Sequence, residues 1–234
     1  MKKINNTLTL IKKALNEVPT LLVVFIAMTL FTMNILANKN IAIGSDFLAL
    51  DTGTTISWIV FLTLDIITKQ KGAKTANVIS VVCCLLNLFF CFLLFVGSKV
   101  PGYWAESYTF AEQADIINLT LNNTVGGTWY VVAMSALSFV VAAFVNNYAF
   151  QFIGLIIPQK AKGSVGFFIQ SLVSTLTGQF VDNMLFSLTV GHFFFGWTLI
   201  QCIGCALFTM TVELLIQIVF TPIAYKLISK RKAY

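Results

Sequence analysis

Two acidic residues, Asp182 and Glu213, lie inside long apolar stretches of the sequence. A carboxylate at the centre of a membrane-spanning helix costs about 2.5–3.5 kcal/mol on insertion scales, so its presence points to a function. An ionised carboxylate can accept paired N–H donors of a ligand. It can also take up a proton and couple transport to proton entry. The alternative for both residues is a structural acid that is hydrogen-bonded to Asn or Ser.

Asp182 shares one helix face with small and polar residues. Successive residues of an α-helix are rotated by about 100°. The rotation brings together Ser171, Thr175, Gly178 and Asp182, flanked by Ser174 and Gln179. The opposite side of this segment consists of Phe, Val and Leu. One-sided polarity of this kind predicts a face that lies in a bundle interior or along a substrate cavity.

Other apolar segments carry further polar candidates. Asp65 lies in the second segment, Asn146 in the fourth, and Asn34 at the end of the first. Asp65 precedes Lys69 by four residues, so a structural ion pair is as good an interpretation as a binding role. A single Asn, Ser or Thr more often holds membrane helices together than binds a ligand.

The composition is typical of an all-α integral membrane protein. Of the 234 residues, 58% are hydrophobic and 10% charged, and the mean hydropathy is +0.86. Ordinary soluble domains contain about 25% charged residues. The formal charge of +6 does not indicate nucleic-acid binding, because the basic residues mark the ends of apolar segments.

Neither catalysis nor a bound metal or cofactor is expected. The five cysteines lie in apolar runs, and a single His leaves little to complete a zinc site. Cys202 and Cys205 have the spacing of a redox or metal motif, but they lie within an apolar helix and are interpreted as packing residues. The sequence has no hydrolase motif and no phosphate-binding loop. We therefore expect a protein that is not an enzyme.

Window hydropathy predicts a bundle of six membrane spans. They cover about residues 19–38, 53–68, 74–97, 128–158, 164–189 and 194–228, so the chain 1–234 is expected to form one domain. Residues 1–18 are expected to be an amphipathic helix on the membrane surface or a flexible tail. Residues 98–127 form the longest loop, either a lid or a plain connector.

The basic residues predict the orientation in the membrane. With six spans, all of them except Lys39 and Lys99 fall on one side. Positively charged residues concentrate in the cytoplasmic loops of membrane proteins. We therefore expect both termini in the cytoplasm and the 98–127 loop outside the cell.

Three patches resemble the bacterial queuosine-precursor transporters, also called the vitamin-uptake-transporter-like family. The patches are Thr63-Leu-Asp65-Ile-Ile-Thr68 before Gly72, then Ser174-Thr175 with Gln179, Asp182 and Phe186, and finally Thr221-Pro222 with Tyr225. Members usually have an acid, an aromatic residue and Gly after the first patch. Here the sequence is Lys69-Gln70-Lys71-Gly72, so the chain is a divergent member.

The resemblance implies import of a small deazapurine, such as 7-cyano- or 7-aminomethyl-7-deazaguanine, across the bacterial cytoplasmic membrane. One carboxylate could accept both the ring N–H and the exocyclic amine of a guanine-like edge. By this analogy Asp182 binds the donor edge, with Gln179 and Asn183 or Asn146 nearby. The other candidate binding residues are Asn34, Asp65, Ser174, Thr175 and Glu213.

The family also resembles the substrate-binding subunits of energy-coupling-factor importers, six-helix proteins that borrow an ATPase module. Their first helix often carries an Ala-x-x-x-Ala docking pattern, whereas here Ala27 is followed by Phe31. A stand-alone transporter, alone or as a homodimer, is therefore preferred over a subunit with an ATPase partner. Such a subunit for another vitamin or nucleobase is one alternative, and a non-transporting membrane scaffold is another.

Overall fold

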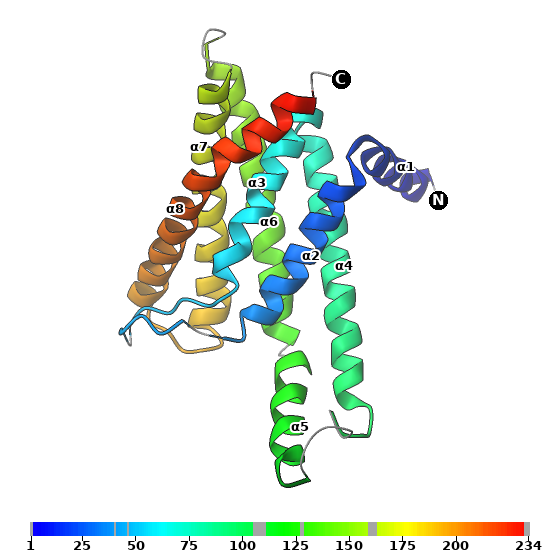
Figure 1. Ribbon diagram of the computed structural model, residues 1–234, viewed down its shortest axis with the longest axis vertical. Coiled ribbons are helices and arrows are strands. Elements are labelled where there is room, and N and C mark those ends of the chain that lie inside the picture. The colour runs from blue at the N-terminus through cyan, green and yellow to red at the C-terminus, as the bar shows by residue number, and fades with distance from the viewer. Residues whose placement is uncertain are drawn as a thin grey trace.

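The computed structural model of the protein is a bundle of helices that run roughly along one direction (Figure 1). It describes residues 2–39, 41–45, 47–104, 111–126, 129–158 and 163–231. The helices are α1 (Lys2–Glu17), α2 (Thr20–Leu36), α3 (Thr54–Lys71), α4 (Ala73–Lys99), α5 (Ala111–Gly126), α6 (Trp129–Ile156), α7 (Ser164–Phe186) and α8 (Leu199–Arg231), with a π-helical turn, η3 (Ser187–His192), after α7. The described residues contain no β-strand, which confirms the all-helical prediction.

Apolar side chains cover much of the outside of the bundle, as expected for a protein surrounded by lipid. Leu21, Phe89, Leu155 and Ile200, on four different helices, are each more than half exposed. Three stretches of the described chain are long and apolar enough to cross a membrane: Ala73–Lys99, Asp115–Ile156 and Leu199–Lys226. The bent pair of α1 and α2 makes a fourth if it counts as one span. The chain is therefore a multi-pass membrane protein.

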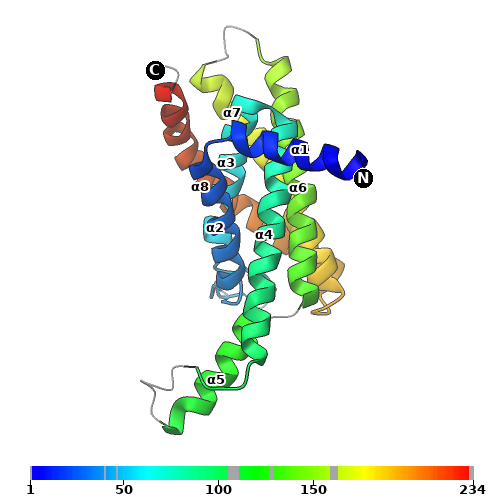
Figure 2. The same cartoon turned by 90° about the vertical axis from the view of Figure 1, so that its right-hand side faces the viewer.

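Helix α1 turns away from the bundle at a sharp bend. Its described stretch Asn6–Glu17 makes an angle of 106° with α2 (Figure 2). Pro19 lies at the bend, and a proline disfavours helical geometry in the residue before it. Ala14 of α1 is buried and α1 contacts α4, whereas Leu8 and Leu10 are exposed. Residues 2–17 are thus helical, with an apolar surface that the bundle leaves uncovered.

A single residue, Gly72, joins α3 to α4. Its φ of +84° is a conformation that side chains rarely adopt, and its N–H donates to Thr68 O at 2.9 Å. The N–H of Ala73 then donates to Gln151 Oε1 of α6 at 3.1 Å. This bond satisfies one of the N–H groups that the start of a helix leaves free. The link therefore fixes the start of α4 to both α3 and α6.

An apolar core lies between α2, α3, α4 and α6. Ile26, Leu64, Ile79 and Ala143, one from each of these helices, have no exposed surface. Lipid is as apolar as these side chains, so close packing rather than exclusion of water holds membrane helices together. The polar side chains gather instead where α3 and α6 meet α7 and α8.

Residues 98–127 contain helix α5, which the sequence did not predict. Helix α5 contacts α4 and projects beyond one end of the bundle, away from α1 and from the end of α8 (Figures 1 and 2). The backbone N–H of Trp104 donates to Asn118 Oδ1 at 3.0 Å, and its indole N–H donates to Asn122 Oδ1 at 2.8 Å. These bonds tie α5 to the segment that leaves α4.

Candidate functional site

Asp65 lies at the centre of a buried polar cluster. Oδ1 of Asp65 accepts hydrogen bonds from Asn146 Nδ2 at 2.9 Å and Ser174 Oγ at 3.3 Å. Oδ2 accepts from Ser171 Oγ at 2.6 Å and Thr175 Oγ1 at 3.5 Å. With Gln217, these residues form what we call the Asp65 group: Asp65, Asn146, Ser171, Ser174, Thr175 and Gln217. All six have no exposed surface, so the group is closed to solvent.

The Asp65 group joins four helices and extends toward a fifth. Gln217 of α8 donates to Ser171 Oγ at 3.0 Å and to the Thr175 hydroxyl. On the opposite side, Asn147 of α6 accepts from Thr68 Oγ1 at 3.2 Å and donates to Asn77 Oδ1 of α4 at 2.8 Å. Buried polar side chains are stable when they find such partners. The network therefore fixes α3, α4, α6, α7 and α8 relative to one another.

Close packing of α6 on α7 makes this geometry possible. Gly178 lies on the α7 face that carries Thr175 and Asp182. A Cβ atom at Gly178 would lie 2.7 Å from Asn146 Cβ and 3.3 Å from the backbone O of Ala142. Glycine is thus required for the two backbones to approach, and the approach lets Asn146 of α6 and the hydroxyls of α7 meet at Asp65 of α3.

Two alternatives left open by the sequence can be compared with the structure in this region. Asp65 does not pair with Lys69: its four donors are neutral, and Lys69 Nζ donates to Gln170 Oε1 at 3.4 Å. The reason is that Asp65 points into the bundle while the long lysine side chain stays exposed at its surface. Asn146, expected near Asp182, donates to Asp65 instead.

Glu213 lies in a second buried polar site. Its Oε1 accepts a hydrogen bond from the Ser57 hydroxyl of α3, and its Oε2 accepts from Asn183 Nδ2 of α7 at 2.8 Å. Asn183 also donates to the backbone O of Gln179 at 3.0 Å. Glu213 is 4% exposed. The carboxylate therefore links α8 to α3 and α7.

Two more acids lie close to Glu213. Asp182 and Asp51 both interact electrostatically with it, and with each other. Asp51 precedes α3 and accepts a hydrogen bond from the N–H of Thr54 at 3.0 Å. Burial raises the pKa of Asp51 above its ordinary value. We call Asp51, Asp182 and Glu213 the acidic cluster. Among the described residues, the charged side chains that act on Asp182 and Glu213 are all acidic.

Asp182 opens onto a small cavity. The cavity lies between α2, α4, α6 and α7 and is lined by Leu30, Met33, Asn34, Cys84, Asn87, Ser135, Ala136, Phe139 and Asp182. Its volume is about 20 Å³, which is room for one or two water molecules. Across the cavity, Ser135 Oγ donates to Asn34 Oδ1 at 3.5 Å. Asp182 receives no hydrogen bond from the described residues.

Gln179 lies between the Asp65 group and the acidic cluster. It follows Thr175 and precedes Asn183 by one helical turn each. Its side chain has no exposed surface, and neither its Nε2 nor its Oε1 has a hydrogen-bond partner among the described residues. Buried amides without partners are uncommon and costly in proteins. Gln179 is therefore the most evident group for binding a polar ligand.

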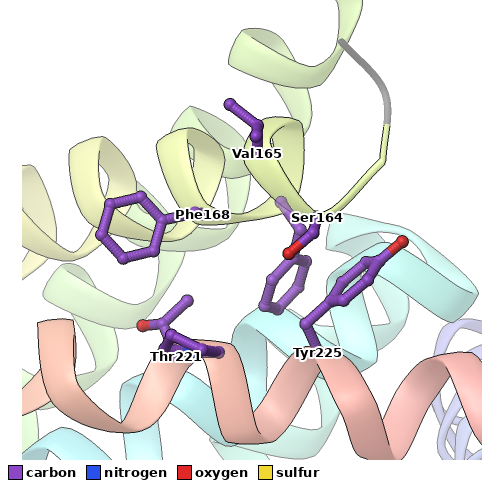
Figure 3. A pocket seen from close by; sticks show the side chains of 7 residues that line it. Ser164, Val165, Phe168, Thr221 and Tyr225 are labelled. Atoms are coloured by element: carbon purple, nitrogen blue, oxygen red, sulfur yellow. The ribbon is translucent and has the colours of Figure 1, made fainter.

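A separate pocket of about 170 Å³ lies between the start of α7 and the end of α8 (Figure 3). It is lined by Ser164, Val165, Phe167, Phe168, Thr221, Pro222 and Tyr225, and Figure 3 shows Tyr225 facing Ser164. Pro222 has no N–H and therefore interrupts the hydrogen bonding of α8. No charged side chain lines this pocket, which makes it a poor site for a polar ligand.

The residues predicted from sequence thus separate into two places. Asp65, Asn146, Ser174 and Thr175 belong to the Asp65 group. Asp182, Asn183, Glu213 and Asn34 lie at the acidic cluster or its cavity, and Gln179 lies between the two places. Three residues that interact with these sites were not among the predicted site residues. They are Asp51 and Ser57, which act on Glu213, and Gln217, which donates to Ser171 and Thr175. Asp51 had a signal in the sequence, since an acid shortly before a helix commonly caps it.

A profile of one protein family, described as a putative vitamin uptake transporter, matches residues 51–227. The match begins at Asp51 and runs from α3 almost to the end of α8, so it contains the Asp65 group and the whole acidic cluster. No curated protein and no solved structure shows a match to the chain.

Proposed function

Because the chain belongs to the vitamin uptake transporter family, we propose that it imports a small deazapurine base, a queuosine precursor, into a bacterial cell. In this proposal six helices, α2, α3, α4, α6, α7 and α8, cross the cytoplasmic membrane and both termini are cytoplasmic. The position of α1 and of the end of α8 toward the same end of the bundle supports an even number of crossings (Figure 1).

The observation that carries the proposal is the acidic cluster beside the unpartnered Gln179. A guanine-like edge offers a ring N–H and an exocyclic amine, which a carboxylate can accept together. Asp182 is the acid best placed for this role, because it lines the cavity and receives no hydrogen bond from the described residues. The Gln179 amide can donate to a ring carbonyl and also accept from the base.

The charge of the acidic cluster favours one substrate over another. Its members repel one another, and no basic side chain acts on Asp182 or Glu213 within the described residues. A ligand amine would offset this repulsion, whereas a cyano group would not. We therefore expect the 7-aminomethyl base to bind more tightly than the 7-cyano base.

In this proposal, the arrangement of helices described above is a closed state of the site. A cavity of about 20 Å³ cannot hold a purine-sized base, for which pockets of about 300 Å³ or more are usual. Binding therefore requires separation of the helices that line the cavity. Such alternation between open and closed arrangements around a central site is the ordinary mode of secondary transporters.

Ala27 and Phe31 of α2 lie where an ATPase module would dock if one powered the transport. Phe31 occupies the position where the docking pattern has a second Ala, and its ring lies 5.1 Å from that of Phe90 on α4. The α2 surface at this point is therefore bulky and already packed. We propose that the protein acts without an ATPase module, as a monomer or homodimer; co-purification with an ATPase pair would contradict this.

Queuosine in tRNA tests the function. The host would lack both precursor synthesis and its own importer and would receive limiting 7-aminomethyl- or 7-cyano-7-deazaguanine. We expect the native chain to restore queuosine and Asp182→Asn to restore little or none. Asp115→Asn removes an exposed acid on α5 and serves as the matched control at equal membrane levels.

The outcomes separate function from site. Restoration by native protein and by both variants would keep the function and remove Asp182 from it. No restoration by a well-expressed native chain would refute the deazapurine proposal. A non-transporting scaffold would fail to restore queuosine with every base supplied.

A further inference from the structure

We propose that the Asp65 group is a sodium site, and that the bound ion holds α3, α6, α7 and α8 in the arrangement that receives the transported base. The ion-binding part concerns the Asp65 group alone. Its coupling to uptake rests on the proposed function. The argument uses charge, unpartnered oxygens and the positions of the helices.

The first observation is a buried carboxyl group whose hydrogen-bond donors are all neutral. Asp65 has no exposed surface, and its four donors are an amide and three hydroxyls, all neutral. The lysine one turn along the helix, Lys69, is exposed and donates to Gln170. Buried charges in proteins are normally paired with an opposite charge or coordinate a metal ion. The Asp65 group therefore has the charge to hold one monovalent cation.

The second observation is a pair of oxygens without donors. Oδ1 of Asn146 and Oε1 of Gln217 are buried and accept no hydrogen bond within the described part of the chain. Both belong to amides that already touch the group, since Asn146 Nδ2 donates to Asp65 and Gln217 Nε2 donates to Ser171. Carboxylate and amide oxygens are the ligands that hard cations prefer.

These oxygens distinguish among the cations. A proton on Asp65 would neutralise the charge but leave both amide oxygens without a partner. A divalent ion would keep an excess positive charge, because Asp65 is the one carboxylate in the group. The sodium and potassium arms of the experiment below separate these two monovalent ions.

The positions of the helices connect such an ion to the acidic cluster. Thr175 and Asp182 lie seven residues apart on α7, or about 10 Å along the helix. On α8, Gln217 follows Glu213 by one turn. An ion that draws Asp65, Asn146 and Gln217 together would therefore also set the spacing of Asp182 and Glu213, which lie on the same two helices.

Direct binding tests the site without any base present. The purified full-length protein would be assayed for binding of radioactive sodium and for thermal unfolding in NaCl, KCl and choline chloride of equal concentration, at two pH values. We expect sodium alone to raise the unfolding temperature. Asp65→Asn should abolish this response, and Gln217→Leu, which removes one ligand, should weaken sodium affinity by about tenfold or more. Asp115→Asn is the control with unchanged affinity.

Several results would overturn the inference. Equal unfolding temperatures in sodium and choline would mean that water molecules satisfy the two amide oxygens. Stabilisation by low pH in all three salts, lost in Asp65→Asn but kept in Glu213→Gln, would assign a proton to Asp65 in place of sodium. If Asp65→Asn does not fold, an unchanged sodium affinity in Gln217→Leu would also contradict the sodium site. None of these measurements depends on uptake, so they remain decisive even if the transported compound is not a deazapurine.

Discussion

Substitution of Gly178 by alanine tests the packing that positions Asn146 at Asp65. The added Cβ would lie 2.7 Å from Asn146 Cβ, 3.2 Å from Phe61 Cε1 and 3.3 Å from the Ala142 oxygen. Overpacking of this kind costs about 1–3 kcal/mol. Alanine also has a higher helix propensity than glycine, which returns up to about 1 kcal/mol. The net effect of the single variant is therefore expected to be modest.

Gly97→Ala in α4 isolates the packing contribution. A Cβ at Gly97 would meet no atom within 4 Å, so this variant gains helix propensity without any clash. The difference in unfolding free energy between the two variants is then the overpacking cost, about 1–3 kcal/mol. At about 2–4 °C per kcal/mol for a protein of this size, Gly178→Ala should unfold some 2–12 °C below Gly97→Ala.

The assay is thermal unfolding of the detergent-purified protein, with uptake measured in parallel. We expect uptake to fall with Gly178→Ala, because the added Cβ displaces Asn146 and so disturbs its hydrogen bond to Asp65 of α3. If both variants unfold at the same temperature, α6 and α7 do not approach each other at Gly178 as closely as described. That result would refute the packing argument for the position of Asn146.

Two further predictions concern the ends of α3. Gly72→Ala should lower the unfolding free energy by about 1–2 kcal/mol, because φ is +84° while a Cβ there would meet no atom within 4 Å; an unchanged unfolding temperature would show that the link adapts. Burial raises the pKa of Asp51, so the folded protein binds the proton of its carboxyl group more tightly than the unfolded chain does. The stability that this proton provides is therefore lost as the pH rises above about 3.9, the ordinary pKa of an Asp in the unfolded chain. Asp51→Asn, which keeps a capping side chain, should flatten that decline in unfolding temperature, and a pH profile identical to that of the native protein would contradict the assignment.

The sequence predicted the helices better than it predicted their contacts. Long apolar runs in the sequence located the helices α2, α3, α4, α6, α7 and α8, because each run is continuous over about 16 residues or more. Helix α5 was missed because acidic residues, Asn and Thr interrupt its apolar residues, which leaves no continuous apolar run. Its bonds to Trp104 involve residues far from it in sequence, which periodicity does not reveal.

The polar residues of the site were recognised, but their pairing was not. Helical periodicity placed Ser171, Thr175 and Asp182 on one face of α7, and two of these three do contact Asp65. Whether Asn146 meets Asp65 or Asp182 depends on how α6 is rotated and shifted against α7. That placement is set by the contact at Gly178, a property of two helices together that neither sequence segment contains alone.

The one-residue link at Gly72 lies in the part of the molecule whose helices are joined most directly. Gly72 and the bond from Ala73 to Gln151 lock α3, α4 and α6 into a unit, and the approach at Gly178 adds α7. Helix α2 packs on this unit in the apolar core, but its chain connection to α3 is the longer segment 37–53. It is also the helix that closes the cavity beside Asp182 through Leu30, Met33 and Asn34. In the proposed transport cycle, an opening wide enough for a base would then require α2 to move relative to α3, α4, α6 and α7, which keep their arrangement.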